Sequence, residues 1–182
     1  MDAVSEVENS LLINEKSLTS NYEAIKRSGR TARISVDELP SLPNTRDGKP
    51  IDSYAVPLDI VRVRGSRNEA YIGTLIAGKD IVKAAVRLGP QQRRQADTTF
   101  YSHLAGQIDG HGAADRVKVK GIKRPILYFK NTGGVRVYFM EFDKLDQKPV
   151  IIRVAICYKN EQVSILAKLT NIPSAQLKSM IS

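Results

Sequence analysis

The sequence predicts an α+β domain in which helices pack on an antiparallel β-meander, with a helical or extended N-terminal arm before it. Two observations support this class. The last third of the chain contains three apolar, β-branched runs separated by turn residues, the pattern of consecutive antiparallel strands. The middle of the chain instead repeats apolar residues at helical spacing. Together these two patterns define the fold class that we expect.

Size and composition predict one domain and a tail. With 182 residues, the chain is long enough for one hydrophobic core and too short for two ordinary domains. Its hydrophobic fraction of 42% and charged fraction of 26% are those of a globular protein, so the chain is expected to fold. We place a boundary near Ser53, between an arm over residues 1–52 and a basic α+β domain over residues 53–182.

The predicted arm combines a weak helix with a proline-containing linker. Apolar residues recur at near-helical spacing from Val4 to Arg27, and Gly29 follows as a helix stop. From Arg33 to Asp52, three prolines and several turn residues predict a linker or an extended segment. The arm either docks on another chain or packs back on its own domain, and the sequence leaves both open.

The next segment is expected to begin with a strand and to continue as helix. Val56 to Val63 has the composition and partial alternation of a strand. Ala70 to Leu88 has helical spacing with a break around Gly78, which predicts two short helices or one kinked helix. Asp80 suits the start of the second of these helices.

A third helix is expected to begin at Pro90, because proline is well tolerated in the first turn of a helix. Its apolar stripe reaches Ile108, before a glycine-containing loop. Near the end of the chain, Gln162–Leu169 is either a fourth strand or the start of a helix, since its apolar run is too short to decide. A short terminal helix is predicted after Pro173.

The predicted meander consists of the runs Ile122–Lys130, Val135–Phe142 and Val150–Tyr158. Its turns fall at Asn131–Gly134 and Asp143–Lys148, where the residue types suit turns. Cations are threaded through the runs, which indicates a surface that meets an anionic partner. These cations are Lys123, Arg124, Lys130, Arg136 and Arg153.

The net charge of +9 favours a phosphate-bearing partner or an anionic membrane surface. Positive charge that serves only solubility is the alternative. We expect the partner to be nucleic acid, RNA or DNA, bound with strong salt dependence and weak sequence specificity. Copies of the chain are further expected to associate through the arm or a sheet edge.

The candidate nucleic-acid-binding residues are arginines and lysines that cluster in sequence. Their guanidinium and ammonium groups, with neighbouring glutamine amides, would meet phosphates and base edges. Several of them alternate along a strand and so share one face. A solvated face with weak, exposed ion pairs is the other interpretation. The residues are Arg62, Arg64, Arg67, Arg93, Arg94, Arg116, Lys118, Lys120, Lys123, Arg124 and Arg136.

Neither a cofactor, a metal site nor a catalytic residue is expected. Cys157 is the single cysteine, which excludes an intramolecular disulfide, and its apolar run predicts burial. The group His103, Asp109, His111 and Asp115 matches no zinc spacing. Walker, dinucleotide-binding and nucleophile-elbow motifs are absent. For the aromatic residues of the meander, packing in the core is favoured over a role as stacking platforms for bases.

The chain is expected to be intracellular, in the cytoplasm or, for a eukaryotic or viral protein, in the nucleus. Residues 1–10 carry three acids and no basic residue. No apolar stretch has the length of a signal-peptide core or a transmembrane segment.

Three functional hypotheses follow. The first is a non-enzymatic, self-associating nucleic-acid-binding protein, such as a viral matrix or nucleocapsid-associated protein. The second is enzymatic, because the element order and charge resemble those of the RelE-like ribonuclease toxins of toxin–antitoxin pairs. This resemblance implies RNA-orienting and acid–base roles for Lys123, Arg124, Arg136, Tyr138, Tyr158 and Lys159. The third is an interaction module for an acidic protein, whose binding would survive moderate salt.

Overall fold

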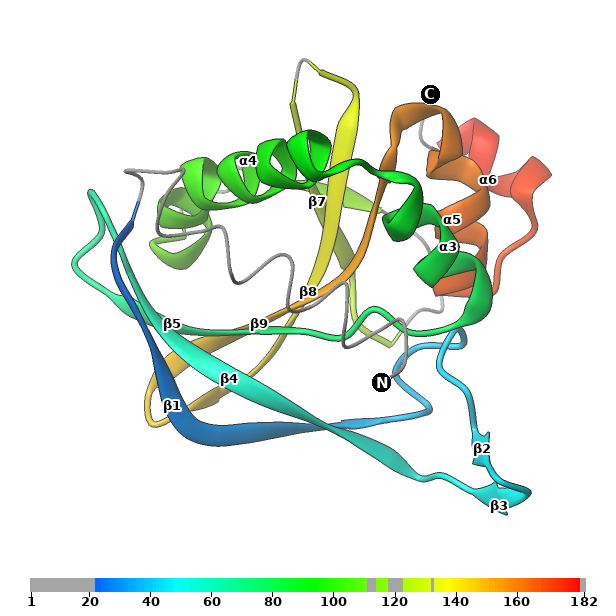
Figure 1. Ribbon diagram of the computed structural model, residues 1–182, viewed down its shortest axis with the longest axis horizontal. Coiled ribbons are helices and arrows are strands. Elements are labelled where there is room, and N and C mark those ends of the chain that lie inside the picture. Colours follow the sequence, from blue (N-terminus) through cyan, green and yellow to red (C-terminus); the bar gives the residue numbers. More distant parts are fainter. Residues whose placement is uncertain (1–21, 111–113, 118–122, 132, 181–182) are drawn as a thin grey trace.

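The computed structural model describes residues 22–110, 114–117, 123–131 and 133–180. Within these residues, helices pack on a seven-stranded mixed sheet with the strand order β1-β4-β5-β9-β8-β7-β6 (Figure 1). A small two-stranded hairpin lies apart from this sheet. The α+β class is therefore confirmed.

The strands of the large sheet are β1 (Tyr22–Ser35), β4 (Ser53–Val63), β5 (Glu69–Thr74), β6 (Asp115–Val117), β7 (Ile126–Lys130), β8 (Val135–Leu145) and β9 (Lys148–Tyr158). The hairpin consists of β2 (Thr45–Arg46) and β3 (Lys49–Pro50). The helices are α3 (Lys79–Arg87), α4 (Pro90–Ile108), α5 (Gln162–Thr170) and α6 (Ser174–Met180), with a 3-10 turn η1 (Lys159–Glu161) before α5.

The sheet is mixed, which corrects the expectation of a purely antiparallel one. Strands β6 to β9 pair antiparallel in chain order, and so do β1, β4 and β5. The two halves meet where β5 runs parallel to β9. A parallel pair needs a long crossover connection, and here α3, α4 and strands β6 to β8 provide it.

Strand β1 occupies a region that we expected to be helix and linker. It pairs with β4 from Tyr22 to Ser35, with an irregularity between Arg27 and Thr31. At this irregularity Gly29 has a φ of 73°, and Ser28 Oγ donates a hydrogen bond of 2.6 Å to the Leu58 carbonyl. The prediction was wrong here because long-range strand pairing outweighs a weak helical period. Ser53, where we expected a boundary, is the first residue of β4, and β1 on the other side of it belongs to the same sheet. Residues 1–21 lie outside the described residues.

The segment Ala70–Leu88 was misread in its first half and correctly predicted in its second. Its first half is β5, which is buried from Ala70 to Thr74 because the strand lies between β4 and β9. A strand covered on both faces lacks alternation and therefore resembles a helix in sequence. Helix α3 follows with Asp80 in its first turn, and α4 begins at Pro90 as predicted.

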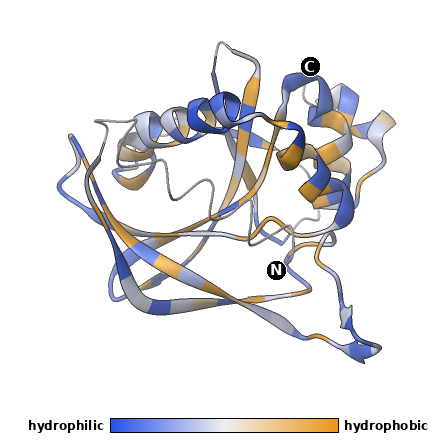
Figure 2. Ribbon diagram, in the orientation of Figure 1, coloured by the Kyte–Doolittle hydropathy of each residue, from blue (hydrophilic) through white to orange (hydrophobic). Residues whose placement is uncertain are grey.

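The core lies between the sheet and its helices. Helix α4 crosses one face, where the Phe100 ring lies 5.9 Å from both the Phe129 and Phe139 rings. Tyr138 is also fully buried, so core packing of these aromatic residues is confirmed. Helices α3, α5 and α6 cluster at another end of the molecule (Figure 1). Figure 2 shows apolar residues concentrated along the central strands and within this helix cluster.

A buried ion pair fixes α4 to the sheet. Arg153 of β9 is 0% exposed, and its Nη1 lies 3.2 Å from the buried Asp97 Oδ1 of α4. Its Nε donates to Thr74 Oγ1 at 3.1 Å, and its guanidinium lies 4.9 Å from the centre of the Phe100 ring. Arg153 was expected on a surface for an anionic partner, so this expectation was wrong: the residue joins β9, β5 and α4 in the core.

Stability should depend on pH through Asp59, a nearly buried residue of β4. Burial raises the pKa of this carboxyl, although Arg27 and Arg153 act in the opposite direction. The unfolded chain therefore loses this proton at a lower pH than the folded protein, and the folded state binds more protons between the two pKa values. Stability from this group is complete below the unfolded-state pKa of about 3.9 and falls as pH rises toward the folded-state pKa.

The Asp59→Asn variant removes this titration. We expect its free energy of unfolding, measured by urea denaturation from pH 3.5 to 6.5, to rise relative to that of the wild type as pH increases. A wild type that gains stability relative to the variant over this range would show that ion pairing with Arg27 outweighs burial.

Candidate nucleic-acid interface

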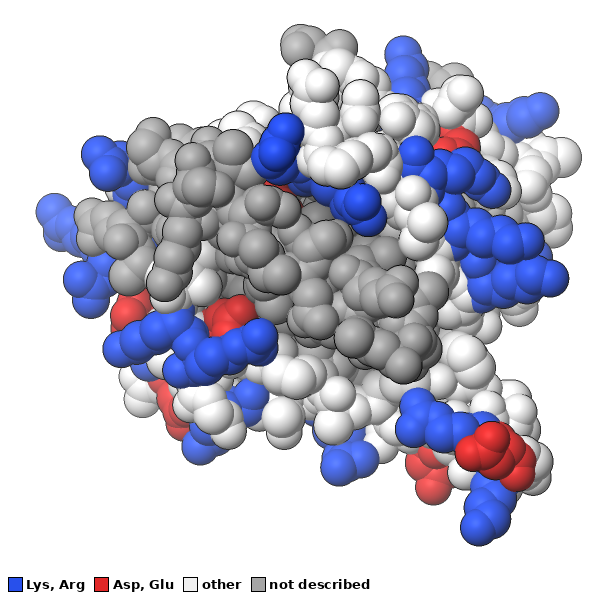
Figure 3. All heavy atoms as spheres, in the orientation of Figure 1, with Lys and Arg blue, Asp and Glu red and all other residues white. Residues whose placement is uncertain are grey.

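A depression that we call the basic hollow lies between the β4–β5 turn, the end of α4 and the β8–β9 turn. Its volume is about 460 Å³. Figure 3 shows Lys and Arg side chains over the edge of the molecule where Figure 1 places the β4–β5 turn. Four cations and two acids are among its lining residues, which are Arg62, Arg67, Asn68, Glu69, Ile108, Lys144, Asp146, Gln147, Lys148 and Pro149.

The β4–β5 turn holds its arginines at the end of α4. Alternation along β4 buries Val61 and Val63 and leaves Arg62 exposed between them. After the strand, Ser66 Oγ and Asn68 Nδ2 donate hydrogen bonds of 2.7 and 2.9 Å to Asp109 Oδ1, at the C-terminal cap of α4. Because these two bonds flank the exposed Arg67, this arginine is held beside the hollow. Arg64, also exposed, follows β4 directly.

The β8–β9 turn supplies the opposite wall. Asp146 and Gln147 both adopt positive φ, of 51° and 65°, which reverses the chain and brings Lys144 and Lys148 to either side of the turn. Tyr71 Oη donates a 2.7 Å hydrogen bond to Asp146 Oδ2, and this bond is the main reason that the pKa of Tyr71 is raised. The turn is thus anchored to β5.

Both acids of the basic hollow already have partners. Glu69 lies 3.7 Å from Arg62, and Asp146 lies 3.7 Å from Arg30 in addition to its bond with Tyr71. The remaining cations of the lining are Arg67, Lys144 and Lys148. Within the described part of the chain, no carboxylate lies within ion-pair distance of any of these three. The hollow therefore carries excess positive charge.

The other predicted binding residues are dispersed. Arg116 is exposed on β6, and Lys123 and Arg124 lie beside Glu38, with 3.0 Å between Arg124 Nε and Glu38 Oε2. Lys118 and Lys120 lie outside the described residues.

Arg136 is 7% exposed and cannot face a partner from this position. The reason is that β8 is an interior strand, whose residues from Val135 to Met140 are buried on both faces. The expectation that Arg136 belongs to a binding surface is therefore corrected. Lys144 and Lys148, in contrast, are lining residues that we did not predict, and the only signal for them in the sequence is their place at a predicted turn.

A second polar depression, which we call the amide groove, lies at the other end of α4. It consists of two adjoining hollows of about 430 and 440 Å³ that share Gly133 of the β7–β8 turn. Its lining contains four side-chain amides, two cations and no acid. These residues are Gln91, Arg94, Gln95, Thr98, Thr99, Asn131, Gly133, Gly134, Tyr158, Lys159 and Asn160. Arg93, predicted with Arg94, is half-exposed in the same first turns of α4.

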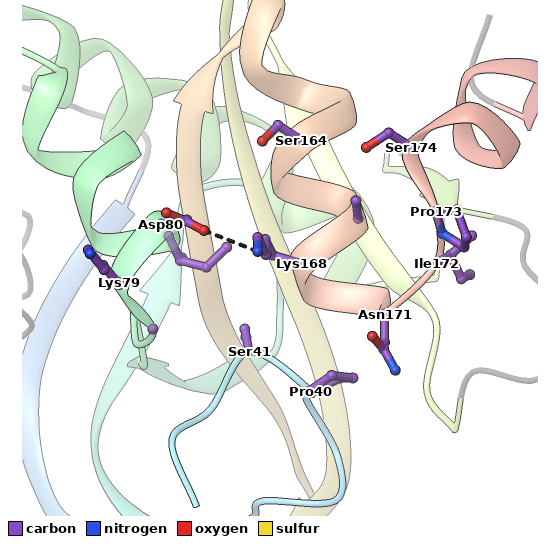
Figure 4. A pocket seen from close by; sticks show the side chains of 13 residues that line it. Pro40, Ser41, Lys79, Asp80, Ser164, Lys168, Asn171, Ile172, Pro173 and Ser174 are labelled. Carbon is purple, nitrogen blue, oxygen red and sulfur yellow. Dashed lines mark ion pairs between the residues drawn. The ribbon is translucent and has the colours of Figure 1, made fainter.

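A third hollow, of about 640 Å³, separates α3 from α5 (Figure 4). Figure 4 shows Asp80 and Lys168 facing each other across it, with 3.2 Å between Asp80 Oδ2 and Lys168 Nζ. With this ion pair formed, Lys79 is the one further charged residue among the lining residues, and hydroxyl, amide and aliphatic groups make up the rest. The described residues contain no group of three or more His, Cys, Asp and Glu side chains that could hold a metal ion. Because one of its two cations is paired with an acid of the same lining, this hollow is a weaker candidate for binding a polyanion than the basic hollow.

Gly78, at the rim of this third hollow, is expected to be intolerant of substitution. Its φ is 97°, and a Cβ atom there would lie 2.4 Å from the Ser41 carbonyl oxygen. Gly78→Ala should therefore lower the free energy of unfolding by about 2–4 kcal/mol, from strain and overpacking together. Gly65→Ala is the matched control, since Gly65 also has positive φ but has no atom within 4 Å of the added Cβ. Equal losses in urea denaturation would contradict a specific role for the contact with Ser41.

The residues implied by the resemblance to RelE-like toxins do not converge. Arg136 and Tyr138 are buried, and burial raises the pKa of the Tyr138 hydroxyl, which makes it a poor proton donor. Tyr158 and Lys159 line the amide groove, whereas Lys123 and Arg124 line a different hollow beside their ion-pair partner Glu38. The geometry therefore gives no support to a shared catalytic centre.

No protein-family model, curated protein or solved structure matches this chain. Among the described residues, no helix is both long enough and apolar enough to cross a membrane.

Proposed function

We propose that this protein binds nucleic acid through the basic hollow and does not cleave it. One observation carries the proposal: cations from two turns about 80 residues apart meet in one depression, whose acids are already paired. Charge that serves only solubility does not need to be clustered in one depression. A concave surface with excess positive charge instead suits a chain of phosphates.

The chemistry of the lining suits phosphate groups. Arg67 offers a planar fork for two phosphate oxygens, while Lys144 and Lys148 act as point charges. The amides of Asn68 and Gln147 add hydrogen bonds without charge. Contacts of this kind position a nucleic acid but carry little sequence information, so binding should be weakly specific.

The exposed edge of the sheet is unfavourable for self-association. Strand β1 is an edge strand of 14 residues and would be the natural template for a second copy. However, it exposes four cations, and like charges on an edge oppose pairing between two copies. These residues are Lys26, Arg27, Arg30 and Arg33.

The test is a titration of labelled single-stranded RNA and of duplex DNA with the purified protein, at salt concentrations from 50 to 300 mM. Each sample is then run on a denaturing gel. We expect intact nucleic acid that is bound with a steep salt dependence. No binding at 50 mM salt would overturn the proposal, and cleaved RNA would overturn its non-enzymatic part. Binding that is unchanged at 300 mM salt would contradict phosphate neutralisation as its basis.

A further inference from the structure

We infer that the bound nucleic acid is a single strand that runs along α4 from the basic hollow into the amide groove, where its bases are contacted. This inference rests on the proposed function and extends it to the form of the ligand and to a second site.

Helix α4 connects the two depressions. Ile108, its last residue, lines the basic hollow, and its first two turns line the amide groove from Gln91 to Thr98. A helix of 19 residues is about 28 Å long. At the 3.4 Å spacing of a stacked strand, this length corresponds to about eight nucleotides. Figure 1 shows α4 running from the β7–β8 turn toward the β4–β5 turn.

The exposed side chains of α4 itself carry no negative charge, although Gln107 near its end donates a hydrogen bond to the Glu141 carboxylate of β8. Asp97 is the only acid in the sequence of this helix, and it is buried against Arg153. Asp109, which follows the helix, accepts hydrogen bonds from the β4–β5 turn. The side chains that α4 exposes along its length are polar and include no acid; they are Gln91, Gln95, Thr98, Ser102 and His103. A phosphate chain would therefore meet no carboxylate of α4 between the two depressions.

The amide groove has the groups that contact unpaired bases. Side-chain amides of Gln91 and Asn160 can bond base edges, and the half-buried ring of Tyr158 provides a stacking surface. Arg94 and Lys159 lie in the same lining, where they can contact the adjoining phosphates. This set combines stacking and cationic groups, as single-strand-binding surfaces do.

A duplex does not fit the same groove. To read paired bases, α4 would have to enter a major groove about 12 Å wide as a projecting helix. The β7–β8 turn lies directly beside it instead: a Cβ atom on Gly133 would be only 3.2 Å from Gln95 Oε1. With the turn against the helix, base edges are reached only where they are already unpaired.

The experiment measures affinity for uridine oligonucleotides of 4, 8, 12 and 16 nucleotides by fluorescence anisotropy. Wild-type affinity should rise at least tenfold between 4 and 12 nucleotides and then level off. The Arg94→Gln/Lys159→Gln variant should lose most of this gain with length. The matched control is Lys83→Gln/Lys178→Gln, which removes two exposed charges outside the path and should leave the length dependence unchanged.

A stacking role for Tyr158 is tested separately. Tyr158→Leu should weaken binding of the 12-mer by about tenfold, whereas Tyr158→Phe should bind it as the wild type does, because the ring is retained. Thermal unfolding of both variants verifies that they fold. Equal affinities of the two folded variants for the 12-mer would contradict base stacking on this residue.

The outcomes separate this inference from the proposed function. If the wild type binds no oligonucleotide at low salt, the proposed function itself fails. If the Arg67→Gln/Lys144→Gln variant is weakened but Arg94→Gln/Lys159→Gln keeps the full gain with length, the proposed function stands and the path along α4 is wrong. Tighter binding of duplex than of single strand, with a loss on Arg94→Gln, would also overturn the single-strand inference.

Discussion

Replacement of Asp97 by alanine is expected to lower the free energy of unfolding by about 3–5 kcal/mol. The reason is the burial of Arg153, whose side chain is 0% exposed and loses its carboxylate partner in this variant. Removing one partner of a buried ion pair leaves an uncompensated charge in the core, which lowers the free energy of unfolding strongly. Replacing both partners by apolar residues changes it much less. Urea denaturation followed by circular dichroism measures the change.

Two comparisons make this prediction specific. The Asp97→Leu/Arg153→Met double variant removes both charges and should recover most of the stability lost by Asp97→Ala. Asp80→Ala breaks the pair with Lys168, in which both side chains are about half exposed, and should cost less than about 1 kcal/mol. A loss below 1 kcal/mol for Asp97→Ala would show that the buried pair does not hold α4 on the sheet.

The second large effect concerns nucleic-acid binding. Arg67→Gln/Lys144→Gln should reduce affinity for single-stranded RNA by about 10–100-fold at 50 mM salt, because the variant loses two charges that neutralise phosphates. Both side chains are exposed and lack ion-pair partners among the described residues, so folding should be unaffected. The Lys83→Gln/Lys178→Gln control carries the same net charge change outside the hollow. Equal losses in the two double variants would indicate attraction by net charge alone.

Elements with strong local signals could be predicted from the sequence. Helix α4 was found because Pro90 opens it and its apolar stripe is regular, and β8 and β9 because turn residues bound their β-branched runs. Strands β1 and β5 were not predicted because their conformation depends on pairing with other strands. β1 pairs with β4, which follows it only after the β2–β3 hairpin, and β5 lies in the interior of the sheet, where it also pairs with β4. The local spacing of apolar residues does not show which strands will pair.

The candidate site was predictable only in part. Arg62 and Arg67 are close in sequence and both line the basic hollow, but Lys144 and Lys148 join them only through the fold. Alternation along a strand indicates which residues share a face but not whether that face is covered. For this reason the sequence could not distinguish exposed cations from Arg136 and Arg153, which lie on interior strands.

The most direct test of nucleic-acid binding by the basic hollow is the slope of the logarithm of affinity against the logarithm of salt concentration. It is measured for single-stranded RNA with the wild type and with Arg67→Gln/Lys144→Gln. The wild-type slope should be steep, and the variant slope should be shallower by about 1.4, or 0.7 for each lost phosphate contact. Parallel slopes for the two proteins would contradict the assignment of the basic hollow as the phosphate-binding surface.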